Sequence, residues 1–234
     1  MRIVTYNIRG GLGCDGVRSL ARVADTLRDL RPDVVCLQEV HRFLPVSRFA
    51  DQPAELERML GMRIAFHPVS RLGIARFGNA VATRLPIHSI GMHRLTNDRE
   101  RERPAMRWES RGLLELVVDA PGGPLRVMTT HWSLNATDRL LSSATVAEMA
   151  GGCPEPVILC GDLNAPPDSL EVTQLVRRSG LADAASADSQ PTYPADAPNA
   201  RIDVILRSPK LGEARAWTVA SPASDHLPLV AEWG

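Results

Sequence analysis

The chain has 234 residues, and its 27 basic side chains balance 27 acidic ones to a formal net charge of zero. This length fits one large domain or two small ones, and a composition of 44% hydrophobic and 23% charged residues is that of an ordinary soluble protein. Proteins that grip long nucleic acids usually carry a basic surplus, so any contact with nucleic acid must be local here.

The N-terminal half is predicted to begin with a strand, a helix and a second strand. Residues 2–7, RIVTYN, are rich in β-branched side chains, which favour strands. Apolar residues then recur at helical spacing over 17–27, with Asp15 as the expected cap. Residues 33–39, DVVCLQE, are typical of a buried strand. Further expected elements are a short helix over 54–60 and strands over 62–69, 79–84, 86–95, 112–119 and 125–131.

The C-terminal half is predicted to alternate strands with helices and to finish with strands alone. Its expected elements are a helix over 136–149, a strand over 156–161, a helix over 169–178, and strands over 201–206, 212–219 and 226–233. The Pro- and Ala-rich segment 186–200 is expected to be a loop within the domain, because the strands after it need partners. Many short strands with few helices predict an α+β fold of two stacked sheets with helices outside. We expect a single domain over residues 1–234.

The cysteines and the N-terminus indicate the compartment. Cys14, Cys36, Cys153 and Cys160 are too few and too scattered for a disulfide framework, and no CxxC pair suggests a thiolate zinc site. Two of them, Cys36 and Cys160, lie in apolar runs and are expected in the core. A strand pattern at the N-terminus leaves no room for a signal peptide, and no apolar run approaches membrane-spanning length. These features predict a reducing, cytoplasmic compartment, whereas the sequence does not indicate an oligomeric state.

Polar side chains stand at the ends of the predicted strands. In a largely antiparallel arrangement, the carboxyl ends of some strands share a rim with the amino ends of others. One rim could therefore gather eight side chains, those of Asn7, Glu39, His131, Asp162, Asn164, Asp203, Asp225 and His226. A single polar strand end is explained by contact with water, but eight of them, including several carboxylates, indicate a functional site.

The side chains of this rim favour one kind of chemistry. Clustered carboxylates raise one another's pKa unless a cation or a hydrogen-bond donor compensates. Glu39 and Asp225, with amide oxygens nearby, are hard oxygen ligands that suit Mg²⁺ or Mn²⁺. Such a metal polarises a phosphoryl oxygen, an Asp can deprotonate a water, and Asn or His can contact the phosphate. The set predicts metal-assisted hydrolysis of a phosphate ester.

Seven segments in chain order carry a family resemblance. They are TYNIRGG (5–11), LQEV (37–40), GNAVATRLPI (78–87), TTHWSLN (129–135), CGDLNAPPDS (160–169), RIDVIL (201–206) and SDHLPLV (224–230). With them the chain resembles the endonuclease/exonuclease/phosphatase superfamily of metal-dependent hydrolases, which includes DNase I, AP endonucleases, sphingomyelinases and inositol phosphatases. The resemblance implies a four-layer α/β/β/α sandwich, in which two mixed, mostly antiparallel sheets are flanked by helices.

The resemblance also implies roles around a metal ion. Glu39 looks like the principal metal ligand, and Asn7 sits where the family places an amide beside the metal and the phosphate. Asp225 would face the metal region. Asp162 looks like the residue that positions or activates the attacking water.

Four further residues are implied to act on the phosphate ester. Asn164 would stabilise the transition state, and His226 would bind the scissile phosphate. Asp203 would orient and charge-stabilise His226, because an Asp–His pair raises the basicity of the imidazole. His131 matches a second histidine of DNase-like members, an acid for the leaving group. The carboxylate that partners this histidine in some members has no counterpart in this sequence.

The sequence also carries features bearing on two other classes of protein, a dinucleotide-binding enzyme and an inactive binding module. GLGCDG (11–16) matches the GxGxxG of dinucleotide-binding folds, but Asn7 and Arg9 interrupt the tight strand-to-glycine turn and few βαβ units follow. We expect an active-site loop there instead. A catalytically inactive binding module would be expected to have replaced several of the residues named above, and all of them are present.

The substrate is the least specified feature. Arginines alternate with glutamates within 99–109, which predicts a solvated, salt-bridged loop. Cys160 before GDLN, and ARID around Asp203, depart from the inositol 5-phosphatase pattern. We expect hydrolysis of an unidentified phosphodiester, with DNA or RNA cleavage as the alternative. A sphingomyelinase-like activity is less favoured, because no apolar membrane-facing loop is evident.

Overall fold

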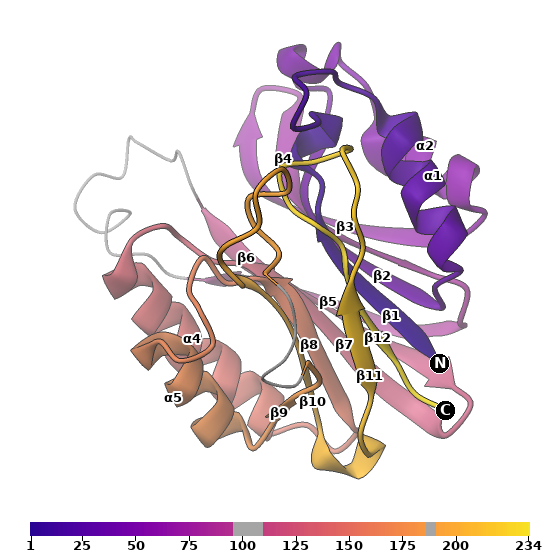
Figure 1. Ribbon diagram of the computed structural model, residues 1–234. Coiled ribbons are helices and arrows are strands. Elements are labelled where there is room, and N and C mark those ends of the chain that lie inside the picture. The colour runs from indigo at the N-terminus through magenta and orange to yellow at the C-terminus, as the bar shows by residue number, and fades with distance from the viewer. Residues whose placement is uncertain (96–109, 186–190) are drawn as a thin grey trace.

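Two six-stranded sheets face each other in the centre of the molecule, and helices cover their outer faces (Figure 1). This computed structural model describes residues 1–95, 110–185 and 191–234. The arginine- and glutamate-rich segment and part of the loop 186–200 lie outside the described residues. The arrangement confirms the predicted α+β fold and the four-layer sandwich implied by the resemblance.

The first sheet has the strand order β11-β12-β1-β2-β4-β3. Its strands are β1 (Arg2–Asn7), β2 (Val34–Arg42), β3 (Arg63–Leu72), β4 (Ala75–Thr83), β11 (Arg215–Thr218) and β12 (Leu229–Glu232). β1 and β2 run parallel, because helix α1 (Leu20–Leu30) returns the chain between them, and the other pairs are antiparallel. Helices α1 and α2 (Gln52–Leu60) cover the outer face of this sheet (Figure 1).

The second sheet has the strand order β5-β6-β7-β8-β10-β9. Its strands are β5 (Ile87–Leu95), β6 (Arg111–Ala120), β7 (Gly123–His131), β8 (Val157–Asp162), β9 (Ala182–Asp183) and β10 (Asp203–Arg207). Only β7 and β8 are parallel, with helix α4 (Ala136–Gly151) between them. Helices α4 and α5 (Leu170–Ser179) cover the outer face. Short 3₁₀ turns occur at Arg9–Gly11, Pro45–Ser47 and Pro209–Leu211.

Three hydrophobic clusters hold the four layers together. The cluster between the sheets includes Cys36 and Cys160, both fully buried, which confirms their predicted place in the core. A second cluster joins the first sheet to α1 and α2, and a third joins the second sheet to α4 and α5. Each arises because side chains alternate between the two faces of a strand, so apolar strands supply both layers. The polar strand ends are left at the edge of this packing.

Some boundaries differ from the predicted ones. Helix α1 begins at Leu20, where Ser19 is the cap and its Oγ accepts a hydrogen bond from the Arg22 amide. Asp15, the predicted cap, instead accepts from the Val17 amide in a turn before the helix. The helix therefore starts four residues after Gly16, too far for the GxGxxG to open it as a dinucleotide-binding turn would require.

The boundaries of one more helix and one strand differ from the predicted ones, and one short strand was not predicted. Helix α2 begins at Gln52, because Asp51 caps it, two residues earlier than predicted. The strand expected over 226–233 is confined to Leu229–Glu232, since Pro228 has no amide to donate. The two-residue β9 was not predicted.

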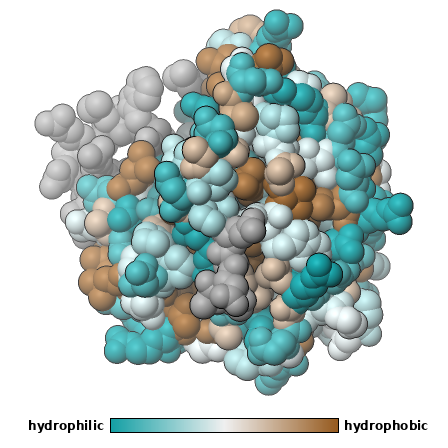
Figure 2. Space-filling model, in the orientation of Figure 1, coloured by the Kyte–Doolittle hydropathy of each residue, from teal (hydrophilic) through white to brown (hydrophobic). Residues whose placement is uncertain are grey.

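The surface seen in Figure 2 intermixes hydrophilic and hydrophobic side chains. Within the described ranges, no helix combines the length and apolar character needed to cross a membrane.

Gly161 is the position in β8 where a side chain would disturb the fold most directly. Its φ is +152°, and a Cβ there would lie 2.0 Å from the Thr130 carbonyl oxygen of β7. We predict that Gly161→Ala lowers the free energy of unfolding by about 1–3 kcal/mol or more, from overpacking together with backbone strain. Urea denaturation measures this. Gly122→Ala, with no atom within 4 Å of the added Cβ, is the control, and equal stability of the two variants would contradict the prediction.

Candidate active site

Three neighbouring strands of the second sheet place a row of titratable side chains at one rim. β7 and β8 are parallel, so their last residues, His131 and Asp162, lie directly opposite each other. β10 is antiparallel to β8, and its first residue, Asp203, also lies opposite Asp162. The prediction that strand beginnings and strand ends share this rim is therefore confirmed for these three residues.

The first sheet adds Asn7 and Glu39 from its two parallel strands. Asn7 is the last residue of β1, and Glu39 lies within β2 where the pairing with β4 shifts register between Leu37 and Val40. Glu39 takes a φ of +57°, which few non-glycine residues adopt. Such a bulge changes the face of the sheet toward which a side chain points. Strained backbone of this kind often occurs at functional positions.

The side-chain amide of Asn7 joins carboxylates of both sheets. Its Nδ2 donates to Glu39 Oε1 at 3.1 Å and to Asp162 Oδ2 at 3.0 Å. Its Oδ1 accepts from the Arg9 amide at 3.1 Å. In this arrangement the N–H groups of Asn7, and not its oxygen, face the carboxylates.

Asp162 is the centre of the cluster and is almost fully buried, at 1% exposure. Its Oδ1 accepts from the Asn164 amide at 2.9 Å, and its Oδ2 lies 3.4 Å from Nε2 of His131 and 3.6 Å from Nε2 of His226. Burial, and then the nearby charge of Asp203, raise the pKa of Asp162 to about 7. A carboxyl with that pKa can exchange a proton near neutral pH.

His226 forms a buried pair with Asp203. Nδ1 of His226 lies 2.9 Å from Asp203 Oδ2. Burial disfavours the imidazolium, but the charge and hydrogen bond of Asp203, with help from Asp162, outweigh it and raise the pKa of His226 to about 10. The Tyr193 ring covers the imidazole, with its centroid 4.9 Å away. His226 is therefore protonated at neutral pH and aims Nε2 toward Asp162.

Asn164 and His131 form the other side of the cluster. Asn164 takes a φ of +49°, and its Nδ2 lies 2.9 Å from the Trp132 carbonyl oxygen and 3.1 Å from His131 Nε2. Burial and then the charge of Arg111 lower the pKa of His131 well below its ordinary value, so this imidazole is neutral at pH 7. Within the described residues Nδ1 of His131 has no hydrogen-bond partner.

Asp225 is held by two neighbours at the mouth of the cluster. Its Oδ2 forms an ion pair with Nη1 of Arg9 at 3.3 Å, and its Oδ1 accepts from Ser224 Oγ at 3.2 Å. Ser224 Oγ also donates to the Asn7 carbonyl oxygen, which ties this loop to β1. Burial first, and also the charge of Asp225, raise the pKa of Glu39. The two carboxylates therefore act on each other electrostatically.

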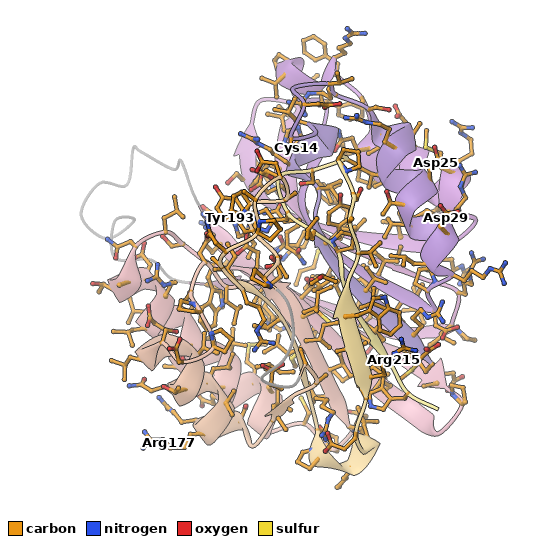
Figure 3. The ribbon with its side chains drawn as sticks, viewed as in Figure 1. Cys14, Asp25, Asp29, Arg177, Tyr193 and Arg215 are labelled. Atoms are coloured by element: carbon orange, nitrogen blue, oxygen red, sulfur yellow. The ribbon has the colours of Figure 1, made fainter. Side chains whose placement is uncertain are left out.

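Six of the eight predicted residues line one cavity of about 550 Å³. They are Glu39, His131, Asp162, Asn164, Asp225 and His226. Asn7 lies beneath the cavity, and Asp203 lies behind His226. Tyr193, which is labelled in Figure 3, also lines the cavity. All eight residues are thus brought to one site.

Arg111 and Tyr193 are lining residues that act on the predicted histidines and were not singled out from the sequence. Arg111 begins β6, and β6 is antiparallel to β7, so Arg111 lies at the same rim as His131. The rule that strand beginnings share this rim would have found it, but the strand was expected to start at Gly112. Tyr193 lies in a loop, where no strand pattern indicates which way a side chain points.

Two sets of donors in and around this cavity are candidates for holding a divalent cation. Glu39 and Asp225 are hard carboxylate ligands that the sequence suggested, whereas the Asn7 oxygen, the third suggested donor, accepts from the Arg9 amide and does not face them. Burial raises the pKa of Glu39. The second set is Asp162, Asp203 and His226, whose donor atoms lie within 4.8 Å of one another. In the second set Asp203 and His226 are bonded to each other, and a protonated imidazole does not bind a metal. The members of the second set are thus already paired with one another, whereas the Glu39 carboxylate accepts from the Asn7 amide.

Comparisons with known proteins match this architecture. The sequence profile of the Endonuclease/Exonuclease/phosphatase family matches residues 4–226. Protein YbhP of Escherichia coli strain K12, whose name describes it as uncharacterized, is 28% identical over 253 aligned residues, which span 99% of this chain and 95% of YbhP.

Solved structures show the same fold. An endonuclease/exonuclease/phosphatase of Beutenbergia cavernae is 27% identical with a TM-score of 0.82, over 99% of this chain and 70% of that one. A mannosyl-6-phosphatase of Bacteroides thetaiotaomicron gives 20% and 0.80, over 99% and 98%. The human Nocturnin catalytic domain gives 23% and 0.73, over 99% and 93%. Because the profile covers nearly the whole chain, this protein belongs to the endonuclease/exonuclease/phosphatase family.

Proposed function

We propose that this chain is a divalent-metal-dependent phosphoesterase that hydrolyses a phosphodiester through attack of a water activated by Asp162. The observation that carries the proposal is the convergence of carboxylates, amides and imidazoles from both sheets on one cavity. Membership of a family named for nucleases and phosphatases supports a phosphohydrolase. The four cysteines are free, which fits the cytoplasmic location that we also propose.

Glu39 and Asp225 would hold Mg²⁺ or Mn²⁺, with Asn7 beside it. When bound, such an ion polarises a phosphoryl oxygen and stabilises the charge that develops on the leaving oxygen. Asn7 fixes the Glu39 carboxylate at 3.1 Å and so limits where that charge lies. Arg9, paired with Asp225, holds the second carboxylate at the mouth of the cavity.

Asp162 is the proposed base. A pKa raised to about 7 leaves a large share of the carboxylate able to accept a proton near neutral pH. As the water oxygen bonds to phosphorus, its proton passes to Asp162 and the bond from phosphorus to the leaving oxygen breaks. Asn7 and the Asn164 backbone amide hold both carboxylate oxygens in place for this transfer.

His226 and Asn164 are proposed to bind the phosphate. His226, protonated because Asp203 stabilises its charge, presents Nε2–H to a phosphoryl oxygen. Asn164 would stabilise the transition state by turning its side-chain amide, which here contacts the Trp132 carbonyl oxygen and His131, toward the phosphate. We propose that His131, which is neutral, hydrogen-bonds the departing oxygen and does not begin the cycle as an imidazolium.

Nucleic-acid cleavage is the alternative substrate class within the same proposal. The Arg111 guanidinium lines the cavity beside His131, where it could meet a second phosphate of a DNA or RNA strand. The formal neutrality of the chain argues for a smaller phosphodiester. A sphingomyelinase-like substrate and an inactive binding module remain less favoured.

The His226–Asp203 pair gives a first test. We predict that Asp203→Asn lowers the pKa of His226 from about 10 toward the ordinary value of about 6.5, because burial then opposes the charged form with less compensation. A pH titration of the imidazole nitrogens by NMR measures this. Asp119→Asn, which removes a surface carboxylate 2.7 Å from His88, should leave His226 unchanged. A His226 pKa unaffected by Asp203→Asn would rule out this source of its charge.

Hydrolysis assays give a second test. With bis-p-nitrophenyl phosphate, plasmid DNA, abasic oligonucleotide, RNA and sphingomyelin as substrates, we predict activity with Mg²⁺ or Mn²⁺ that EDTA abolishes. Glu39→Ala and Asp162→Ala should each reduce kcat by at least about 10²-fold, the scale typical of losing one essential polar group. His88→Ala, a surface histidine, is the control. Full rates in both site variants would show that this cavity is not the catalytic site.

The salt dependence of the same reaction separates the two substrate classes. Binding to a nucleic-acid backbone releases counterions and weakens steeply with salt, whereas hydrolysis of a small ester does not. We predict that KM for the best substrate changes little with added salt. A steep rise in KM would favour the nuclease alternative.

A further inference from the structure

A second cavity lies on the outer face of the first sheet, on the other side of the β3–β4 hairpin from the proposed active site. It has a volume of about 630 Å³ and is bounded by α2, the hairpin and the end of β2. Along the hairpin, Ser70 and Phe77 line the catalytic cavity, whereas their sequence neighbours Arg71 and Arg76 line the outer one. This follows from the alternation of side chains along a strand.

Three arginines stand side by side across this face. Arg76 of β4 lies directly opposite Arg42 of β2 on one side and Arg71 of β3 on the other. Side chains opposite each other on neighbouring strands are about 5 Å apart, and like charges there repel. A fourth arginine, Arg58 of α2, lines the same cavity. The fold therefore concentrates positive charge at a position where sheet packing alone would disfavour it.

Two carboxylates line the cavity and do not neutralise it. Asp51 pairs with Arg42 at 3.0 Å and also caps α2, while Glu57 accepts a hydrogen bond from the Ile64 amide. Arg76 donates to backbone carbonyl oxygens of its own turn. Across residues 1–95, 110–185 and 191–234, no carboxylate forms an ion pair with Arg58, Arg71 or Arg76. Four arginines thus face two carboxylates, one of which is already paired.

The floor of the cavity is apolar and includes an aromatic ring. Ile64, Phe66 and Pro68 of β3 face it, with Met92 of β5 at its edge. Phe66 and Ile64 are only partly buried against the cluster beneath α2, so their outer surfaces remain accessible. Apolar walls with a few convergent charged groups, at a volume between 300 and 1,000 Å³, are typical of small-molecule sites.

We propose that this outer cavity is a binding site for a small phosphorylated molecule with a flat apolar portion, a nucleoside diphosphate being the chemical type that fits. Adjacent phosphate groups lie across Arg71 and Arg76, because guanidinium groups bind phosphate oxygens through paired hydrogen bonds. The planar portion lies on Phe66 and the neighbouring apolar side chains. This site is separate from the catalytic cavity and does not depend on the function proposed for it.

Calorimetric titration with ADP and with inorganic pyrophosphate, in EDTA, tests the site. We expect ADP to bind, and the double variant Arg71→Ala/Arg76→Ala to weaken it at least about tenfold, the effect of losing charge-assisted hydrogen bonds. Arg177→Ala/Arg178→Ala, which removes two exposed arginines at the end of α5 (Arg177 is labelled in Figure 3), should leave ADP binding unchanged. Hydrolysis of bis-p-nitrophenyl phosphate should be the same in both double variants.

Phe66→Leu tests the apolar half of the site with little loss of volume. It should weaken ADP several-fold and leave pyrophosphate unchanged. Thermal melts of each variant confirm that the fold is retained. Unaltered ADP binding in Arg71→Ala/Arg76→Ala would overturn the proposal. So would loss of ADP binding in His226→Ala alone, because the nucleotide would then occupy the catalytic cavity.

Discussion

The hydrogen bond from Asn7 to Asp162 is the interaction on which the site depends. It crosses from β1 of the first sheet to β8 of the second at 3.0 Å, at the rim where the hydrophobic layer between the sheets ends. Deeper in the layer, Nε2 of Gln38 in β2 likewise donates a hydrogen bond across the sheets, to Oγ1 of Thr129 in β7 at 3.0 Å. Buried polar atoms without partners are costly, so these bonds restrict how the sheets can shift relative to each other. The same amide of Asn7 also holds Glu39, so the packing of the two sheets fixes the separation of two carboxylates of the candidate site.

The carboxylates around Asp162 leave negative charge in the cavity that a bound cation would offset. Glu39, Asp162 and Asp203 approach one another within a largely buried region, and burying a carboxylate is costly unless a partner compensates. The positive charge of the His226 imidazolium is paired directly with the Asp203 carboxylate. Burial and the charge of Asp203 still raise the pKa of Asp162, so this imidazolium does not balance both aspartates. Glu39 has the Asn7 amide but no cationic partner within hydrogen-bonding distance among the described residues. A divalent cation beside Glu39 would supply the missing charge and would lower the pKa of Glu39.

The sequence was sufficient to place the rim residues but not to orient all of them. Asn7, His131 and Asp162 end apolar strands, and a strand pattern shows where a strand ends, so their shared rim follows from the antiparallel topology. Glu39 points into the cavity because of a register shift and a positive φ, and neither leaves a mark in the hydrophobic pattern. Arg111 was missed because a charged first residue looks like part of the preceding loop.

The cap of helix α1 was assigned to Asp15 because Asp and Ser are both good caps. The bridge between Leu12 and Arg18, which delays the start of the helix, depends on contacts that sequence spacing does not show.

The β3–β4 hairpin contributes side chains to the lining of both cavities. Neighbouring residues of a strand point to opposite faces of the sheet. Phe77 and Ser70 therefore line the catalytic cavity, while Arg76 and Arg71 line the outer one. Phe77 also packs against His41 of β2, with ring centroids 5.6 Å apart, and His41 follows the bulge that positions Glu39. A ligand drawn to Arg71 and Arg76 would thus touch strands whose other face bounds the catalytic cavity. Its contacts would bear on the hairpin that carries Phe77, which packs against His41 beside the bulge at Glu39.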